Sequence, residues 1–111
     1  MGVTKLELFT EQQNSIAQLA KAFGHPARVA ILQHLFKTEN CVCGDLVEEI
    51  GLAQPTISQH LKELKNLGLI KGNVEGTSVC YCINKEVWQE MKELFSEFLA
   101  QDVKADNNNC C

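Results

Sequence analysis

Apolar residues along this chain recur at helical spacing in two blocks, with a short strand-like stretch between them. From residue 11 to residue 67, apolar positions fall three or four residues apart, the period of an α-helix with one buried face. Residues 69–74 and 78–83 are typical of two strands joined by a turn around Gly76. Helical spacing then returns after residue 84. The pattern predicts four helices, a β-hairpin and a final helix.

Glycine and proline residues set the limits of these helices. Gly24, Gly51 and Gly68 each follow a helical segment, and Pro26 and Pro55 fit the first turn of the next one. The predicted helices cover residues 11–23, 26–36, 44–50, 53–67 and 85–100. We therefore expect a mostly α fold with one β-hairpin, formed by a single domain over residues 1–105.

The third and fourth predicted helices, joined by a turn that contains Gly51, match a helix-turn-helix. In this motif the second helix enters the major groove of DNA with its N-terminal residues at the base edges. With Ile57, Leu61 and Leu64 facing the core, five polar residues remain on or beside the open face as candidates for DNA contact: Gln54, Thr56, Ser58, Gln59 and Lys62. Glutamine suits the edge of adenine, and lysine suits phosphates.

Charge is distributed unevenly, with a net charge of −4 for the 111 residues. Residues 54–85 carry four lysines and two glutamates, net +2, and form the only positive stretch. This positive charge is small for a DNA-binding protein. We expect binding that needs a homodimer and falls steeply with salt.

Six cysteines lie in three pairs. Cys41 and Cys43 precede the third helix, and Cys80 and Cys82 lie on the second strand of the hairpin. The third pair ends a polar segment over residues 106–111, which we expect to be a flexible tail. We expect a cytoplasmic protein with reduced thiols, which indicates metal or redox chemistry more than a disulfide framework.

Several short motifs together resemble the ArsR/SmtB repressors over roughly residues 14–98. They are His25-Pro26-Ala27-Arg28, Cys41-Val42-Cys43, Gln54-Pro55-Thr56-Ile57-Ser58-Gln59-His60-Leu61, and Leu67-Gly68-Leu69-Ile70 before a glycine-containing wing. The Cys-Val-Cys element is most similar to the arsenic-responsive branch. The resemblance implies a dimeric winged helix-turn-helix that represses a metalloid resistance operon until a toxic ion binds. One extra residue, Gly44, separates Cys43 from Asp45-Leu46 and leaves open whether both thiols have the family's usual geometry or Cys41 lies outside the third helix.

In the winged fold, the segment before the third helix commonly pairs with the second wing strand. Such pairing would lay Asn40-Cys41-Val42 beside Cys80-Tyr81-Cys82, with cross-strand Cβ atoms roughly 4.5–5.5 Å apart. Our hypothesis is one cluster drawn from Cys41, Cys43, Cys80 and Cys82. Three thiolates would suit As(III) or Sb(III), two would suit methylarsenite, and four would suit Zn(II) or Cd(II).

Other interpretations of the cysteines stay open. They can be buried small hydrophobic residues, a thiol redox sensor on the same scaffold, or ligands of a metal buffer that binds no defined DNA. An enzyme is not expected, because no catalytic triad, phosphate loop or pair of catalytic carboxylates is present. Neither an organic cofactor nor a membrane partner is expected. Trp88, Phe95 and Phe98 are interpreted as core and dimer residues, and His25 and His60 as structural or DNA-facing residues rather than ligands.

Overall fold

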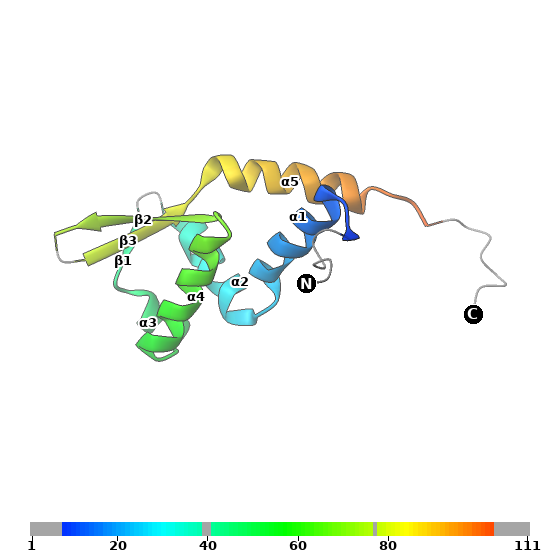
Figure 1. The fold of residues 1–111 in the computed structure, drawn as a ribbon. Helices are drawn as coiled ribbons and strands as arrows, with labels where there is room; N and C mark the ends of the chain where they lie inside the picture. The colour runs from blue at the N-terminus through cyan, green and yellow to red at the C-terminus, as the bar shows by residue number, and fades with distance from the viewer. Residues whose placement is uncertain (1–7, 39–40, 77, 104–111) are drawn as a thin grey trace, which may run out of the picture.

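The computed structural model describes residues 8–38, 41–76 and 78–103, and it has the predicted order of helices and strands (Figure 1). In chain order the elements are α1 (Glu11–Ala20), the 3₁₀ helix η2 (Lys21–Phe23), α2 (Pro26–Lys37), β1 (Val42–Cys43), α3 (Leu46–Ile50), α4 (Gln54–Asn66), β2 (Ile70–Glu75), β3 (Ser78–Ile83) and α5 (Lys85–Leu99). The winged helix-turn-helix prediction is confirmed. The predicted tail, residues 106–111, lies outside the described residues.

The helices and the hairpin occupy separate parts of the molecule. Figure 1 shows α5 running along one side with α1 next to it, while α3 and α4 lie on the opposite side and the β2–β3 hairpin projects away from the helices. Within the described part of the chain, no helix is both long enough and apolar enough to cross a membrane. The arrangement leaves α4 and the hairpin accessible on one side of the molecule.

One apolar core joins α2, α3, α4, the sheet and α5. The amphipathic pattern of the sequence produces it, because every third or fourth residue of α2 and α4 faces inward. Its most buried side chains include Ile31, Leu32, Leu35, Leu46, Ile57, Leu61, Leu64, Leu69, Ile70 and Met91. The predicted inward stripe of α4 is confirmed, with Leu67 only half-buried at its end.

The described residues form a three-stranded sheet in the order β1-β3-β2. β1 pairs with β3 in antiparallel fashion, with Val42 opposite Tyr81 and Cys43 opposite Cys80. The expected minor strand before the third helix is therefore present, but it consists of Val42–Cys43 rather than residues 40–42, and residue 40 lies outside the described residues. Gly44 has a φ of 80°, a conformation that glycine adopts without strain, and it turns the chain from β1 toward α3. Both Cys41 and Cys43 lie outside α3, which answers the question that Gly44 raised.

A buried histidine fastens α4 to α2. His60 is 7% exposed, and its Nδ1 accepts a hydrogen bond of 3.2 Å from Nε of Arg28. Arg28 also donates to the carbonyl oxygen of Lys21 at 2.8 Å, and the His25 ring lies 4.5 Å from the His60 ring. Burial lowers the pKa of His60, and the nearby His25 and Arg28 lower it further. His60 is thus a structural residue rather than a DNA-facing one.

This cluster predicts acid sensitivity. Because the folded-state pKa of His60 lies below its ordinary value of 6.5, the unfolded chain binds the proton more tightly than the folded chain does. The free energy of unfolding should fall as pH drops from about 7.5 through 6.5 and below. His60→Asn retains an acceptor for Arg28 but does not titrate, so its stability should depend less steeply on pH. Urea unfolding from pH 5 to 8 measures this, with His34→Asn as the matched control. Equal pH slopes for His60→Asn and the unmodified chain would refute the assignment.

Candidate functional site

Two cysteine thiols lie together at the junction of β1 and β3. Cys41 and Cys82 are both thiols and both half-buried. The amide Nδ2 of Asn73, on β2, donates to Sγ of Cys41 at 3.5 Å and lies 3.9 Å from Sγ of Cys82. One amide group within reach of both sulfur atoms places the two thiols side by side. Two of the four cysteines of the hypothesised cluster therefore lie together in the structure.

The thiol pair is electrostatically asymmetric. A hydrogen bond with the Cys41 thiol raises the pKa of Cys82, and burial and the charge that Cys41 can carry raise it further. The ammonium groups of Lys71 and Lys85 act in the opposite direction. The proton of Cys82 is therefore held more tightly than that of an ordinary cysteine thiol. Two cations nearby favour the thiolate form once a ligand displaces the proton.

Cys80 differs from the expectation of six reduced thiols. Its sulfur takes part in a disulfide, and its side chain is fully buried. The residue opposite Cys80 in the ladder is Cys43. Antiparallel pairing brings such residues close enough for sulfur chemistry, whereas the sequence alone gives no register. The expectation of reduced thiols is thus wrong for Cys80 in this structure.

Three of the four candidate ligands have a defined state, because Cys41 and Cys82 are thiols and Cys80 is in a disulfide. Cys80 and Cys82 are two residues apart on β3 and share one face of the strand, as predicted, while Tyr81 takes the other. Among residues 8–38, 41–76 and 78–103, no group of three His, Cys, Asp or Glu side chains is placed to hold a metal ion. In the described residues, the arrangement offers two adjacent thiols and not a complete metal centre.

The N-terminal half of α4 presents the predicted polar surface. The five candidates for DNA contact, Gln54, Thr56, Ser58, Gln59 and Lys62, are all exposed. Within the helix, Gln54 donates to Ser58 at 3.1 Å and Gln59 donates to Glu63 at 3.3 Å. These contacts join neighbouring turns of an exposed helix and can be exchanged for contacts with bases. α4 therefore has the surface that a recognition helix requires.

Sequence reasoning missed three residues around the thiols. Asn73 carries no signal of its own in the sequence, because an asparagine in a strand is ordinarily solvated. Lysines in the positive stretch were expected to contact DNA phosphates. Lys71 instead lies in β2 opposite Cys82, and its ammonium group lowers the pKa of that thiol. Lys85 begins α5 and acts on the same thiol. The strand alternation of β2, which places Lys71 and Asn73 on one face, is the signal that could have found two of them.

The family model and the related proteins that match this chain agree on one family. Residues 25–71 match the family described as bacterial regulatory protein, arsR family. An uncharacterised helix-turn-helix transcriptional regulator of Methanocaldococcus jannaschii is 39% identical over 88 residues, which span 78% of this chain and 98% of that protein. The family match covers the helix-turn-helix itself, and the relative extends the similarity to nearly the whole domain.

Solved structures share the fold. The transcriptional repressor BigR from Xylella fastidiosa superposes with a TM-score of 0.60 at 29% identity, over 89% of this chain and all of that one. The cadmium metal-sensor CmtR from Mycobacterium tuberculosis gives a TM-score of 0.53 at 30% identity, over 81% of this chain and 92% of the sensor. The likeness to both structures extends over the helix-turn-helix and the wing together.

The thiol pair predicts an unusual response to mutation. In Cys41→Ala the hydrogen bond that raises the pKa of Cys82 is gone, so the thiolate fraction of Cys82 at pH 7.5 should increase. Alkylation of Cys82 by iodoacetamide, followed by mass spectrometry of its peptide, should become faster. Lys71→Gln should have the opposite effect, because loss of the cation raises the pKa of Cys82 and so slows its alkylation. An unchanged or slower rate in Cys41→Ala would contradict the coupling of the two thiols.

Proposed function

The chain belongs to the ArsR family of transcriptional repressors, whose members are regulators and not enzymes, and on that premise we propose that its signal is a trivalent metalloid. In this proposal the repressor binds operator DNA and leaves it when As(III), methylarsenite or Sb(III) binds its cysteine thiolates. The observation that carries the proposal is the adjacency of the Cys41 and Cys82 thiols immediately before the helix-turn-helix and on its wing. Soft metalloids bind thiolates in preference to nitrogen or oxygen ligands.

The proposed ligand set is Cys41, Cys43, Cys80 and Cys82. Cys41 and Cys82 are two thiols as the structure stands, and each would bind the metalloid as a thiolate after losing its proton. Inorganic As(III) and Sb(III) accept three, so the third comes from Cys80 or Cys43 after the disulfide at Cys80 is reduced. Because Cys43 lies opposite Cys80 in the ladder, reduction would add thiols directly beside the existing pair.

The proposed switch acts through the start of the helix-turn-helix. β1 ends at Cys43, and α3 begins only three residues later at Leu46. A metalloid that draws Cys41 toward Cys82 would move β1 on β3 and carry α3 and α4 with it. The recognition helices of a dimer would then no longer fit their half-sites. Because the two ligands favour different conformations, DNA must weaken metalloid binding by the same factor.

A homodimer is part of the proposal. α1 has no buried residue, and several large apolar side chains near the chain ends are exposed: Leu8, Phe9, Phe98, Leu99 and Val103. A second copy covering these side chains would remove them from water and place two α4 helices on a two-fold symmetric operator. Operator DNA and this dimer are the proposed partners, and the proposed location is the cytoplasm, where that DNA lies.

Redox sensing is the second candidate function. The observation that favours it is the disulfide at Cys80, on the same strand as Cys82. In this alternative, oxidation and reduction of that bond change the pairing of β1 with β3 and so change DNA affinity, without any metalloid. Sensing of Cd(II) or Zn(II) is a third alternative, supported by the similarity to the cadmium sensor CmtR; like the three-thiolate metalloid site, it would need reduction of the disulfide at Cys80.

The proposed release of DNA by metalloids can be tested directly. Fluorescence anisotropy on the DNA upstream of the gene should show that arsenite, methylarsenite or Sb(III) reduces the affinity of the reduced protein by about 5- to 150-fold. Cys80→Ser together with Cys82→Ser should keep DNA affinity and abolish this response. Equal DNA affinity with and without the metalloids would contradict the proposal. Release by peroxide alone would transfer the protein to the redox class.

The proposed DNA contacts of α4 can be tested by substitution of single residues. Lys62→Ala should reduce the salt slope of log K by about 0.9 for each phosphate that this lysine neutralises in the complex. Gln59→Ala should weaken operator binding by about 1–3 kcal/mol and leave non-specific binding nearly unchanged. Lys92→Ala, on α5, is the matched control for removal of one exposed charge. If Lys92→Ala changed the slope as much as Lys62→Ala, α4 would not be the contact helix.

A further inference from the structure

A hollow of about 350 Å³ lies between the N-terminal half of α4 and the wing, which is the β2–β3 hairpin. Its apolar lining comes from three elements and includes Leu46, Val47, Ile57, Leu61 and Val79. Gln54, Ser58 and Tyr81 add polar groups to the lining. Two of the five side chains predicted to contact DNA, Gln54 and Ser58, therefore lie on the wing side of α4.

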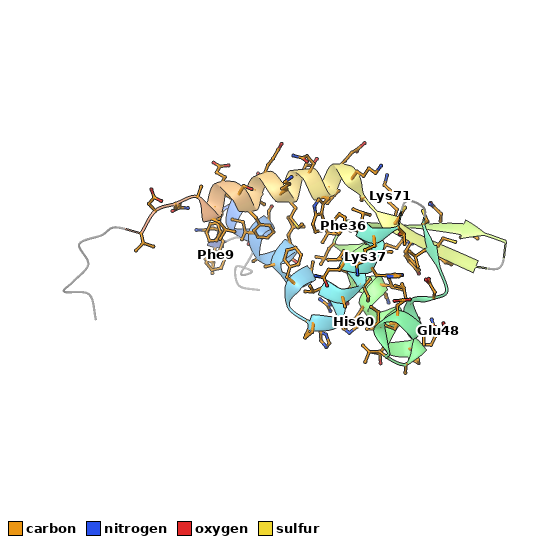
Figure 2. The ribbon with its side chains drawn as sticks, turned by 180° about the vertical axis from the view of Figure 1, so that it is seen from behind. Phe9, Phe36, Lys37, Glu48, His60 and Lys71 are labelled. Carbon is orange, nitrogen blue, oxygen red and sulfur yellow. The ribbon has the colours of Figure 1, made fainter. Side chains whose placement is uncertain are left out.

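One face of the wing continues this apolar lining beyond the hollow. Val74 of β2 pairs with Val79 of β3, and alternation along the strands places both on the face of Tyr81. Val74 is 77% exposed and Val79 is 42% exposed. Lys71 alternates onto the other face, and Figure 2 shows it near the start of α5, on the opposite side of the hairpin from Glu48 of α3. The strand residues on the face toward α4 are thus all uncharged.

One lysine of α4 reaches across to the wing. Gly72 lies opposite Tyr81 in the hairpin, on the same face as the exposed valines. A Cβ atom on Gly72 would lie 3.3 Å from the Tyr81 ring and 3.5 Å from Nζ of Lys65. Because Gly72 has no side chain, the ammonium group of Lys65 can approach this strand closely. A cation therefore lies at the inner end of the apolar face of the wing.

A sugar–phosphate strand has the chemistry that this surface requires. Deoxyribose presents C–H groups to a protein, and phosphate oxygens accept hydrogen bonds from amide, hydroxyl and ammonium groups. Val74 and Val79 suit the sugars, while Gln54, Ser58 and Lys65 suit the phosphates. The surface is also continuous with the exposed face of α4, which in a helix-turn-helix enters the major groove. Charge complementarity and this continuity both indicate DNA as the occupant.

We propose that the surface between α4 and the wing binds the backbone of one DNA strand. Deoxyribose lies against Val74 and Val79, and phosphate oxygens accept hydrogen bonds from Gln54, Ser58 and Lys65. The proposal rests on the proposed function only in that the chain binds DNA, and it is independent of the metalloid. The wing thus contributes to DNA binding through apolar contact with sugars, whereas the cation beside it comes from α4.

The proposal divides the predicted DNA contacts of α4 into two groups. Gln54 and Ser58 position the protein on the backbone without specifying bases, and Thr56 and Gln59 remain to read base edges. Gln54→Ala and Ser58→Ala should each weaken binding to the upstream DNA and to an unrelated duplex of equal length by the same factor. Gln59→Ala should weaken only the first. Fluorescence anisotropy with both duplexes measures this, and a loss confined to the upstream DNA in Gln54→Ala would contradict the division.

Hydroxyl-radical footprinting tests the sugar contact directly, because the radical attacks the C–H bonds of deoxyribose. The full chain at saturation should protect sugars at the edge of each half-site. Val74→Thr combined with Val79→Thr keeps the shape and the strand preference of valine but adds hydroxyl groups. This variant should lose the protection and bind DNA about three- to tenfold more weakly, with an unchanged salt slope. Lys65→Gln should instead lower the salt slope of log K by about 0.9.

Val29→Thr is the matched control, because it makes the same change at a half-buried position on α2, outside the hollow. It should keep both the sugar protection and the affinity, and thermal unfolding should show that every variant is folded. Full sugar protection in the double valine variant would refute the proposal. Sedimentation without DNA tests the other occupant, a second copy of the chain. A changed oligomeric state in the double valine variant would assign the valines to a protein interface and overturn the DNA contact.

The proposed function and this inference fail in different ways. If the unmodified chain binds no DNA, the proposed function fails and the inference fails with it. If metalloids release the chain from DNA but no sugars beside the wing are protected, the function stands and the DNA contact of the wing is wrong.

Discussion

The pairing of β1 with β3 is the constraint on which the candidate site depends. The Cα register that sets Val42 opposite Tyr81 and Cys43 opposite Cys80 brings together two segments that are far apart in the sequence. A shift of the register by one residue would reverse the faces, because strand side chains alternate. The thiol of Cys41 would then point away from that of Cys82, and the site would not exist.

The same pairing links chemistry to DNA contact. β1 is only two residues long and is followed by the left-handed Gly44. Its Val42 is buried in the same core that holds α3 and α4 through Leu46, Ile57 and Leu61. In the proposed switch, a ligand that moves β1 would therefore carry the helix-turn-helix with it through this shared core.

The charged groups near His60 and those near Cys82 have different roles. Burial lowers the pKa of His60, and the neighbouring His25 and Arg28 lower it further, which favours the neutral ring as the acceptor in the contact between α2 and α4. At the thiol pair, Lys71 and Lys85 oppose the forces that raise the pKa of Cys82. The first group of charges stabilises the scaffold, while the second lies where a ligand would exchange with protons. Neither arrangement follows from the net charge of the chain.

The helices, the hairpin and the exposed face of α4 could be predicted from the sequence, because amphipathic spacing, glycine and proline act locally and recur within one or two turns. The approach of Cys41 to Cys80 and Cys82 could also be expected, although it needed the strand order of a winged fold and not spacing alone. The state of Cys80 and the amide of Asn73 between the sulfur atoms of Cys41 and Cys82 were decided only by tertiary structure. They depend on contacts between β1, β2 and β3, and no local pattern in the chain encodes the distance between residues that meet only after folding.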